Sequence, residues 1–288
     1  MKKPQWITIG LALLLTAGLF FFGRTIPSKK TISAANNQKN RNTESDHNSH
    51  IIIDSILALA KRQLSTEQVA RISRLENTLS GGQVTKDQQI HIYHQLARFW
   101  ADSARIFEPY AWYLAEAARL ENSEKTLTFA AQLFLDNLQN EEVPGQKQWK
   151  ALQAKDLFER SLKINPENDS TKVGLGACYL FGDISTTPME GITRIKEVAD
   201  RDSTNVYAQL MLVKGSLLSG QFDKAISRLH TIVRLEKNNA ESMLLLADLY
   251  ERTGDKPNAV TWYQKCLPFV KQADVKKAIE KRIEALKN

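Results

Sequence analysis

Residues 220–229 read GQFDKAISRL and residues 254–263 read GDKPNAVTWY, two stretches that overlay at a spacing of 34 residues. Each opens on glycine and places alanine five positions later, and one period upstream Gly191 takes the place of that alanine. A period of this length predicts two helices per unit, which cross at the small residue. Such units bury their apolar faces only by stacking on neighbours, so we expect a stack of helical hairpins.

The pattern extends upstream to about residue 88 and predicts five units. The first helix of each unit carries a large residue, a leucine, a small residue and an aromatic ring, and the second carries small residues followed by apolar ones. The residues that fit are, unit by unit, Tyr93, Leu96, Ala97, Trp100, Ala111, Ala115 and Ala118; Leu127, Ala130, Ala131, Phe134, Ala154, Phe158, Ser161 and Pro166; Leu175, Gly176, Tyr179, Gly191, Ile195 and Val198; Leu212, Val213, Gly220, Ala225, Leu229 and Ile232; and Met243, Leu246, Ala247, Tyr250, Gly254, Ala259, Tyr263 and Cys266. On these residues the chain resembles the tetratricopeptide repeat family over residues 88–273, with insertions at 139–147 and 182–189.

The resemblance implies an all-α fold, an α-solenoid of stacked helix-turn-helix tetratricopeptide repeats. The N-terminal residues predict one transmembrane helix in front of it. We expect an anchor at 1–23, a disordered polar linker at 24–50, a helical pair at 51–87, about five repeats at 88–273 and a capping helix at 274–288. The helical pair fits no clear unit and is interpreted as a degenerate repeat or a lid. Ser65 and Gln68 are spaced for a capping box at the start of its second helix.

Residues 4–23 carry no charge, as is typical of a membrane-spanning helix. Twenty helical residues span about 30 Å, the thickness of the hydrocarbon core of a bilayer. Lys2 and Lys3 precede this span and favour a cytoplasmic N-terminus. A cleaved signal peptide is the alternative, although residues 23–27, GRTIP, make a poor cleavage site. We therefore expect a single-pass protein of the bacterial inner (cytoplasmic) membrane, with its repeats in the periplasm.

The net charge of +7 is concentrated at the N-terminus. Residues 1–50 contain seven Lys and Arg against two acidic residues, a net charge of +5, which leaves +2 for residues 51–288. A nearly neutral repeat region argues against nucleic-acid binding. Cys178 and Cys266 fall at apolar helix positions, where a thiol behaves as a small hydrophobe, so we do not expect a disulfide.

The sequence contains no motif that predicts an enzyme. We find no phosphate-binding loop, dinucleotide fingerprint or Ser-His-Asp arrangement. His91 and His94 lie three residues apart on a predicted helix, but a stable metal site needs a third or fourth ligand. We therefore expect no catalytic residue, no metal, no cofactor and no small-molecule substrate.

The resemblance also implies a groove lined by residues of the first helices. For the first two units these are His91, His94, Arg98, Asp102, Lys125 and Gln132; for the third they include Val173, Ala177, Leu180 and Phe181; and for the last two they include Tyr207, Leu210, Met211, Lys214, Leu218, Asp248 and Arg252. The groove is predicted to be apolar in the middle and charged at its ends. The candidate partner-binding residues are Leu180, Phe181, Tyr207, Leu210, Met211, Lys214, Leu218, Asp248 and Arg252.

These features predict a membrane-tethered scaffold or adaptor that binds a protein or peptide partner in its groove. An envelope protein-assembly complex is the expected setting. The alternative is a self-associating structural repeat protein whose groove is filled by its own N-terminal helix, residues 51–64. The sequence leaves both hypotheses open.

Overall fold

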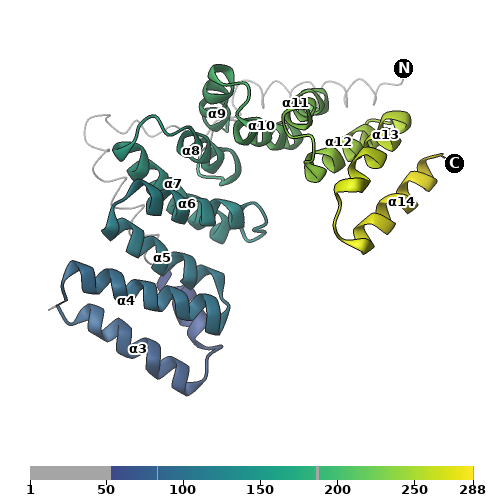
Figure 1. Ribbon diagram of the computed structural model, residues 1–288. Coiled ribbons are helices and arrows are strands. Elements are labelled where there is room, and N and C mark those ends of the chain that lie inside the picture. The colour runs from purple at the N-terminus through teal and green to yellow at the C-terminus, as the bar shows by residue number, and fades with distance from the viewer. Residues whose placement is uncertain (1–52, 83, 186–187, 288) are drawn as a thin grey trace, which may run out of the picture. The chain divides into compact units, whose positions relative to one another are not determined.

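The computed structural model describes residues 53–82, 84–185 and 188–287, and these residues form helices joined by short connections (Figure 1). The predicted all-α repeat fold is confirmed, because the described residues contain no strand. The predicted anchor at 1–23 and linker at 24–50 lie outside the described residues. Among the helices that the structure describes, none is both long and apolar enough to cross a bilayer.

The described chain begins with a helix over residues 53–61, followed by α3, Thr66–Ser80. Ser65 and Gln68 form the expected capping box at the start of α3. Ile53 is 1% exposed and belongs to a core that continues into α5 and α7. Lys61 donates to Glu76 of α3 over 2.6 Å, which ties the two helices together. Residues 53–80 are therefore joined to each other by this ion pair and packed on the stack through apolar contacts.

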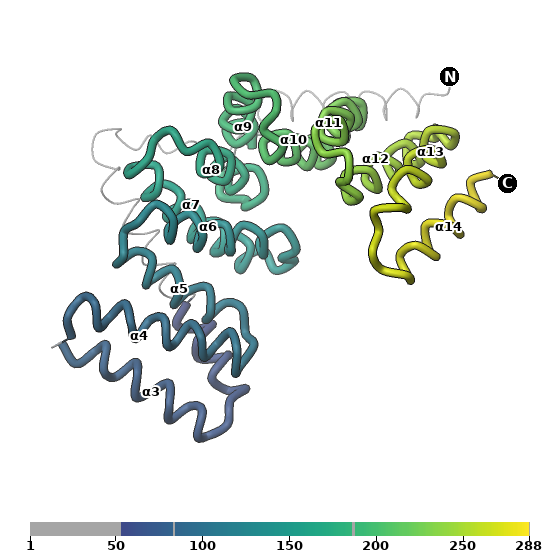
Figure 2. The backbone as a smooth tube through the Cα atoms, viewed as in Figure 1, coloured from purple at the N-terminus to yellow at the C-terminus, as the bar shows by residue number. Residues whose placement is uncertain are grey.

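The remaining helices follow one another as antiparallel hairpins along the tube in Figure 2. Five hairpins pair a first helix with a second: α4, Lys86–Arg98, with α5, Phe107–Glu121; α6, Glu124–Leu138, with α7, Pro144–Ile164; α8, Asp169–Phe181, with α9, Met189–Arg201; α10, Val206–Leu218, with α11, Phe222–Leu235; and α12, Ala240–Arg252, with α13, Lys256–Cys266. A π-helical segment, Phe99–Ala104, extends α4, and a 3₁₀ turn, Leu267–Phe269, leads from α13 to α14, Ala273–Lys287.

Polar caps set where the first helices begin. Ser123, Asn168, Asn205 and Asn239 precede α6, α8, α10 and α12, and each side chain accepts a hydrogen bond from the backbone N–H three residues later. Such a cap satisfies one of the N–H groups that the first turn of a helix leaves unpaired. The repeated caps therefore align the N-terminal ends of successive first helices.

The small residues of the 34-residue period lie where the two helices of a hairpin cross. Ala225 of α11 and Ala259 of α13 are fully buried. Gly191 of α9 faces the backbone of α8 more closely, because a Cβ atom at position 191 would lie 2.3 Å from the carbonyl oxygen of Gly176. The hairpin of α8 and α9 thus depends on glycine at both positions.

The insertion expected at 139–147 is a loop only over residues 139–143, because α7 begins at Pro144. Pro144 occupies the first turn of α7, where its missing N–H is no loss, and α7 runs for 21 residues. The added turns place Trp149 in the core, 5.5 Å from the ring of Phe134, and bury Lys150 to 2% exposure. The insertion therefore enlarges the core of the stack.

At the C-terminus, α14 covers the last hairpin. Ile279 and Ile283 are buried against the same core as Tyr263. The Tyr263 hydroxyl donates to Glu251, and Arg282 of α14 pairs with the same carboxylate. An apolar contact and a shared carboxylate thus join α14 to the last hairpin.

Candidate protein-binding surface

Three of the nine predicted groove residues lie in the core. Leu180 and Phe181 of α8 and Met211 of α10 are 8%, 9% and 3% exposed, so these three side chains lie in the core and not on an open groove. Of the others, Tyr207, Leu210 and Lys214 are half-buried, whereas Leu218, Asp248 and Arg252 are exposed. The apolar middle of the predicted groove is therefore closed.

The closure arises because α6 and α10 meet across α8. The Tyr207 hydroxyl of α10 donates to Gln132 Oε1 of α6 over 3.1 Å. Further along α10, Lys214 Nζ donates to Gln139 Oε1, just after α6, over 2.5 Å. Beneath these two bonds, Val173 and Ala177 of α8 are fully buried. The family resemblance assigns Val173 and Ala177 to the groove. In the structure, the neighbouring first helices cover them.

A hollow of about 840 Å³ remains open beside the Tyr207–Gln132 bond, at the N-terminal ends of the first helices. Its lining residues come from α6, from the start of α8 and from α10: Glu124, Lys125, Thr128, Phe129, Gln132, Asn168, Ser170 and Tyr207. The ring of Phe129 is 59% exposed at this hollow. We call this hollow the α6 pocket.

Sequence reasoning placed Lys125, Gln132 and Tyr207 on the groove face but missed Phe129. The spacing could have identified it, since Phe129 follows Lys125 by four residues and precedes Gln132 by three, which puts all three on one face of α6. Leu127, Ala130 and Ala131 fit the core pattern of the repeat, and they lie on the opposite, buried face of α6.

Hydrogen bonds hold most of the polar side chains of the α6 pocket in place. Glu124 accepts from the amides of Asn165 and Asn168 over 3.0 and 2.5 Å. The Thr128 hydroxyl lies 2.8 Å from that of Ser161. Burial raises the pKa of Tyr207, so its phenol stays protonated and can donate to Gln132. The wall of the pocket is thus preformed.

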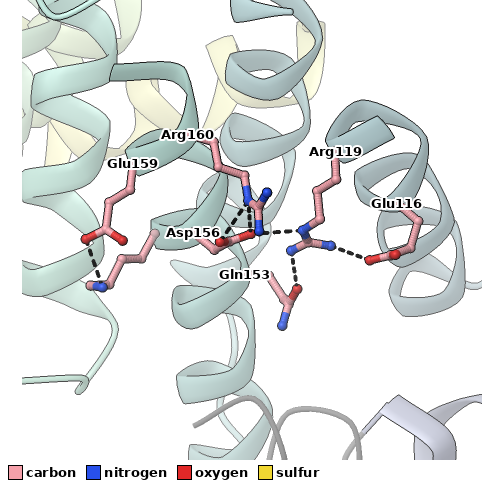
Figure 3. A network of polar contacts seen from close by, with 7 residues as sticks. Glu116, Arg119, Gln153, Asp156, Glu159 and Arg160 are labelled. Carbon is pink, nitrogen blue, oxygen red and sulfur yellow. Dashed lines mark hydrogen bonds and ion pairs between the residues drawn. The ribbon is translucent and has the colours of Figure 1, made fainter. Parts of the chain in front are cut away.

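A separate polar network joins the second helices α5 and α7 (Figure 3). Arg119 of α5 donates to Gln153 and Asp156 of α7 over 2.7 and 2.9 Å, and it also bonds Glu116. Burial acts to raise the pKa of Asp156, but the charges and hydrogen bonds of Arg119 and Arg160 outweigh it and lower the pKa. We interpret this network as structural, since its charges pair with one another.

The histidine and cysteine side chains of the described residues have hydrogen-bond partners or are buried. Within them, no three His, Cys, Asp or Glu side chains are placed to hold a metal ion. His91 and His94 turn to separate partners, Gln95 and Glu121, each at 2.7 Å. Cys178 is free and buried, and burial raises its pKa, which keeps the thiol protonated and unreactive.

A buried cation lies in the core between α5 and α7. Lys150 Nζ lies 2.9 Å from Glu108 and 2.5 Å from Glu141. Burial acts to raise the pKa of Glu141, but hydrogen bonds from Lys150 and the Val143 N–H, with the charge of Lys150, outweigh it and lower the pKa. Native Glu141 therefore releases its proton more readily than Glu141 in the unfolded chain.

This shift predicts a loss of stability in acid. A carboxyl whose folded pKa is lowered contributes stability that is present above its unfolded pKa, 4.5 for Glu141, and lost as the pH falls through the folded pKa. We expect the melting temperature to decline below about pH 4.5, and to decline less in Glu141→Gln, measured by circular dichroism. Parallel declines in the two proteins would contradict the assignment to Glu141.

Comparison with known proteins identifies the repeats. Residues 240–267, which span α12 and α13, match the model of the tetratricopeptide repeat family. Residues 240–267 therefore form a tetratricopeptide repeat, and the resemblance inferred from the sequence is confirmed. No curated protein sequence matches the chain.

Several solved structures are similar to this chain at low sequence identity. A tetratricopeptide repeat protein from Parabacteroides merdae ATCC 43184 is 12% identical, with a TM-score of 0.50, over 84% of this chain and 87% of that one. The thermophilic repeat protein TTC0263 from Thermus thermophilus is 17% identical, with a TM-score of 0.46, over 70% and 98%. MamA from Desulfovibrio magneticus RS-1 is 20% identical, with a TM-score of 0.43, over 63% and 94%.

The described N-terminal helix does not lie over α10 or α12. In Figure 2, residues 53–61 lie beside α5, far along the stack from α12. Ala60 of this helix shares a core with Ile72 of α3 and Leu96 of α4. The contacts of residues 53–61 thus leave the α6 pocket open.

Proposed function

We propose that this chain is a protein-interaction scaffold that binds a segment of a partner protein in the α6 pocket. The observation that carries the proposal is the exposed ring of Phe129 at a preformed hollow of about 840 Å³. Ligand pockets usually measure about 300–1,000 Å³ and combine apolar walls with a few fixed polar groups. The α6 pocket has both features.

Phe129 is suited to anchor a partner. Burying a phenylalanine side chain contributes roughly 1.5–3 kcal/mol, and aromatic side chains are frequent among the residues that dominate binding energy. The neighbouring Tyr207 and Gln132 are held by hydrogen bonds, so little side-chain entropy is lost when a partner binds there. The pocket is also too open to enclose a small metabolite, which favours a segment of a larger molecule.

We further propose that the scaffold is tethered to a bacterial inner membrane through residues 4–23, with the repeats in the periplasm. The support is the uncharged run of twenty residues and the lysines that precede it. Protease added to spheroplasts should digest the repeat region; protection until the membrane is broken would reverse the orientation.

Cross-linking in the native cells tests the pocket. We expect p-benzoylphenylalanine at position 170, on the pocket rim, to form an adduct of defined mass, and Phe129→Ala to lower its yield about tenfold or more, as loss of a binding hot spot does. The same probe at the exposed position 163 of α7 is the control. Phe129→Ala should leave the melting temperature unchanged, since the ring is exposed. Equal yields with and without Phe129 would refute this site.

A further inference from the structure

The free polar groups of the α6 pocket differ in kind from the satisfied ones. Glu124, Thr128, Gln132, Asn168 and Tyr207 all make hydrogen bonds to other side chains. Lys125 and Ser170, by contrast, have no ion pair or hydrogen bond to any described residue. The polar side chains of the pocket without any bond to a described residue are thus one ammonium group and one hydroxyl group, and both can donate to a carboxylate.

We therefore expect the pocket to favour an acidic ligand over a basic one. Glu124 is half-buried, and its Oε1 atom already accepts from two asparagine amides. An anionic ligand meets the exposed Lys125 with its three N–H donors free. Complementary charge of this kind decides which partner binds more than how tightly it binds.

Geometry adds a spacing to this preference. Lys125 and Phe129 are one helical turn apart on α6, which places their Cβ atoms about 5–6 Å from each other. In an extended peptide, side chains on one face recur every two residues, or about 6.6 Å. In such a peptide, an acidic residue and an aromatic residue two positions apart would contact Lys125 and Phe129 at the same time.

Resting on the proposed function, we infer that the α6 pocket binds an extended segment in which an acidic residue lies two positions from an aromatic one. The carboxylate pairs with Lys125 and Ser170, while the aromatic ring packs on Phe129 and Tyr207. The occupant is a partner protein, and the preference for acid is a property of Lys125.

Three labelled peptides test the inference against the full chain in detergent solution. The first is Gly-Ser-Glu-Ser-Phe-Ser-Glu-Ser-Gly, the second has lysine in place of both glutamates, and the third has serine in place of phenylalanine. Fluorescence anisotropy should give the first peptide an affinity at least about fivefold higher than either of the others. The ratio of the affinity for the first peptide to that for the lysine peptide should fall as the salt concentration is raised, because the ion pair with Lys125 is exposed to solvent.

Charge reversal identifies the residue responsible. Lys125→Glu turns attraction into repulsion for the acidic peptide and does the reverse for the lysine peptide, so the ratio of their affinities should shift by about tenfold or more. Lys163→Glu makes the same change of net charge on the exposed surface of α7 and should leave the ratio within about twofold. An equal shift in both variants would mean that net charge, and not this pocket, sets the preference.

The outcomes separate this inference from the proposed function. Equal affinity for the acidic and lysine peptides, or no binding of any peptide up to about 1 mM, overturns the acid–aromatic preference. If cross-linking at position 170 still depends on Phe129, the proposed function stands without the acid–aromatic preference. Self-association that is lost in Phe129→Ala, measured by sedimentation velocity, would identify a second copy as the occupant and overturn the inference.

Discussion

Replacement of Lys150 with alanine is expected to lower the free energy of unfolding by about 3–5 kcal/mol. Lys150 is 2% exposed, and its ammonium group pairs with Glu108 and Glu141, which are themselves 22% and 12% exposed at the side chain. Removal of the lysine leaves two carboxylates close together without a cation, and it opens a cavity beside the ring of Phe107. Each of these changes is destabilising.

Urea denaturation followed by circular dichroism measures this loss. Lys163→Ala, an exposed lysine on the same helix, is the control and should change stability by no more than about 0.5 kcal/mol. Lys150→Met combined with Glu108→Gln and Glu141→Gln should recover much of the loss, since no unpaired charge then remains. A loss below about 1 kcal/mol for Lys150→Ala would mean that water reaches the two carboxylates.

The second large effect is expected for Gly191→Ala. The added Cβ would lie 2.3 Å from the carbonyl oxygen of Gly176 and 2.9 Å from the backbone nitrogen of Leu180. Both are backbone atoms of α8, so the two helices must move apart, which costs about 1–3 kcal/mol or more. The better helix propensity of alanine, worth roughly 1 kcal/mol, offsets only part of this.

Differential scanning calorimetry of two glycine variants checks this expectation. Gly145→Ala is the matched control, because it adds the same methyl group to a helical position with no atom within 4 Å of the new Cβ. We expect Gly145→Ala to keep or slightly raise the melting temperature and Gly191→Ala to lower it by several degrees. Similar melting temperatures for the two variants would show that α8 and α9 can separate without loss.

Much of the fold was predictable because it depends on short-range patterns. The capping box of Ser65 and Gln68 lies within four residues of sequence, and the small residues of the 34-residue period act within one hairpin. The length of α7 was not predictable in this way. Pro144 and Gly145 suggest a loop, yet proline is well tolerated in the first turn of a helix, and the burial of Trp149 stabilises the added turns.

The candidate site was predictable only in part. Repeat logic placed Lys125, Gln132 and Tyr207 on the first-helix face, where they line the α6 pocket. The same logic placed Leu180 and Met211 there, and both are buried. A repeat pattern assigns a direction to each side chain relative to its own helix, but exposure also depends on how closely the neighbouring helices approach.

The sequence by itself determined the all-α repeat fold, the capping box of α3 and the order of the hairpins. Only the tertiary structure decided which part of the first-helix face stays open. Gly174 and Gly176 let α8 pack tightly on Phe158 of α7 and on α9. With α8 drawn toward the second helices, Tyr207 of α10 reaches Gln132 of α6 across it. Distances between helices are set by the packing of many side chains from several units, and no single repeat encodes that sum.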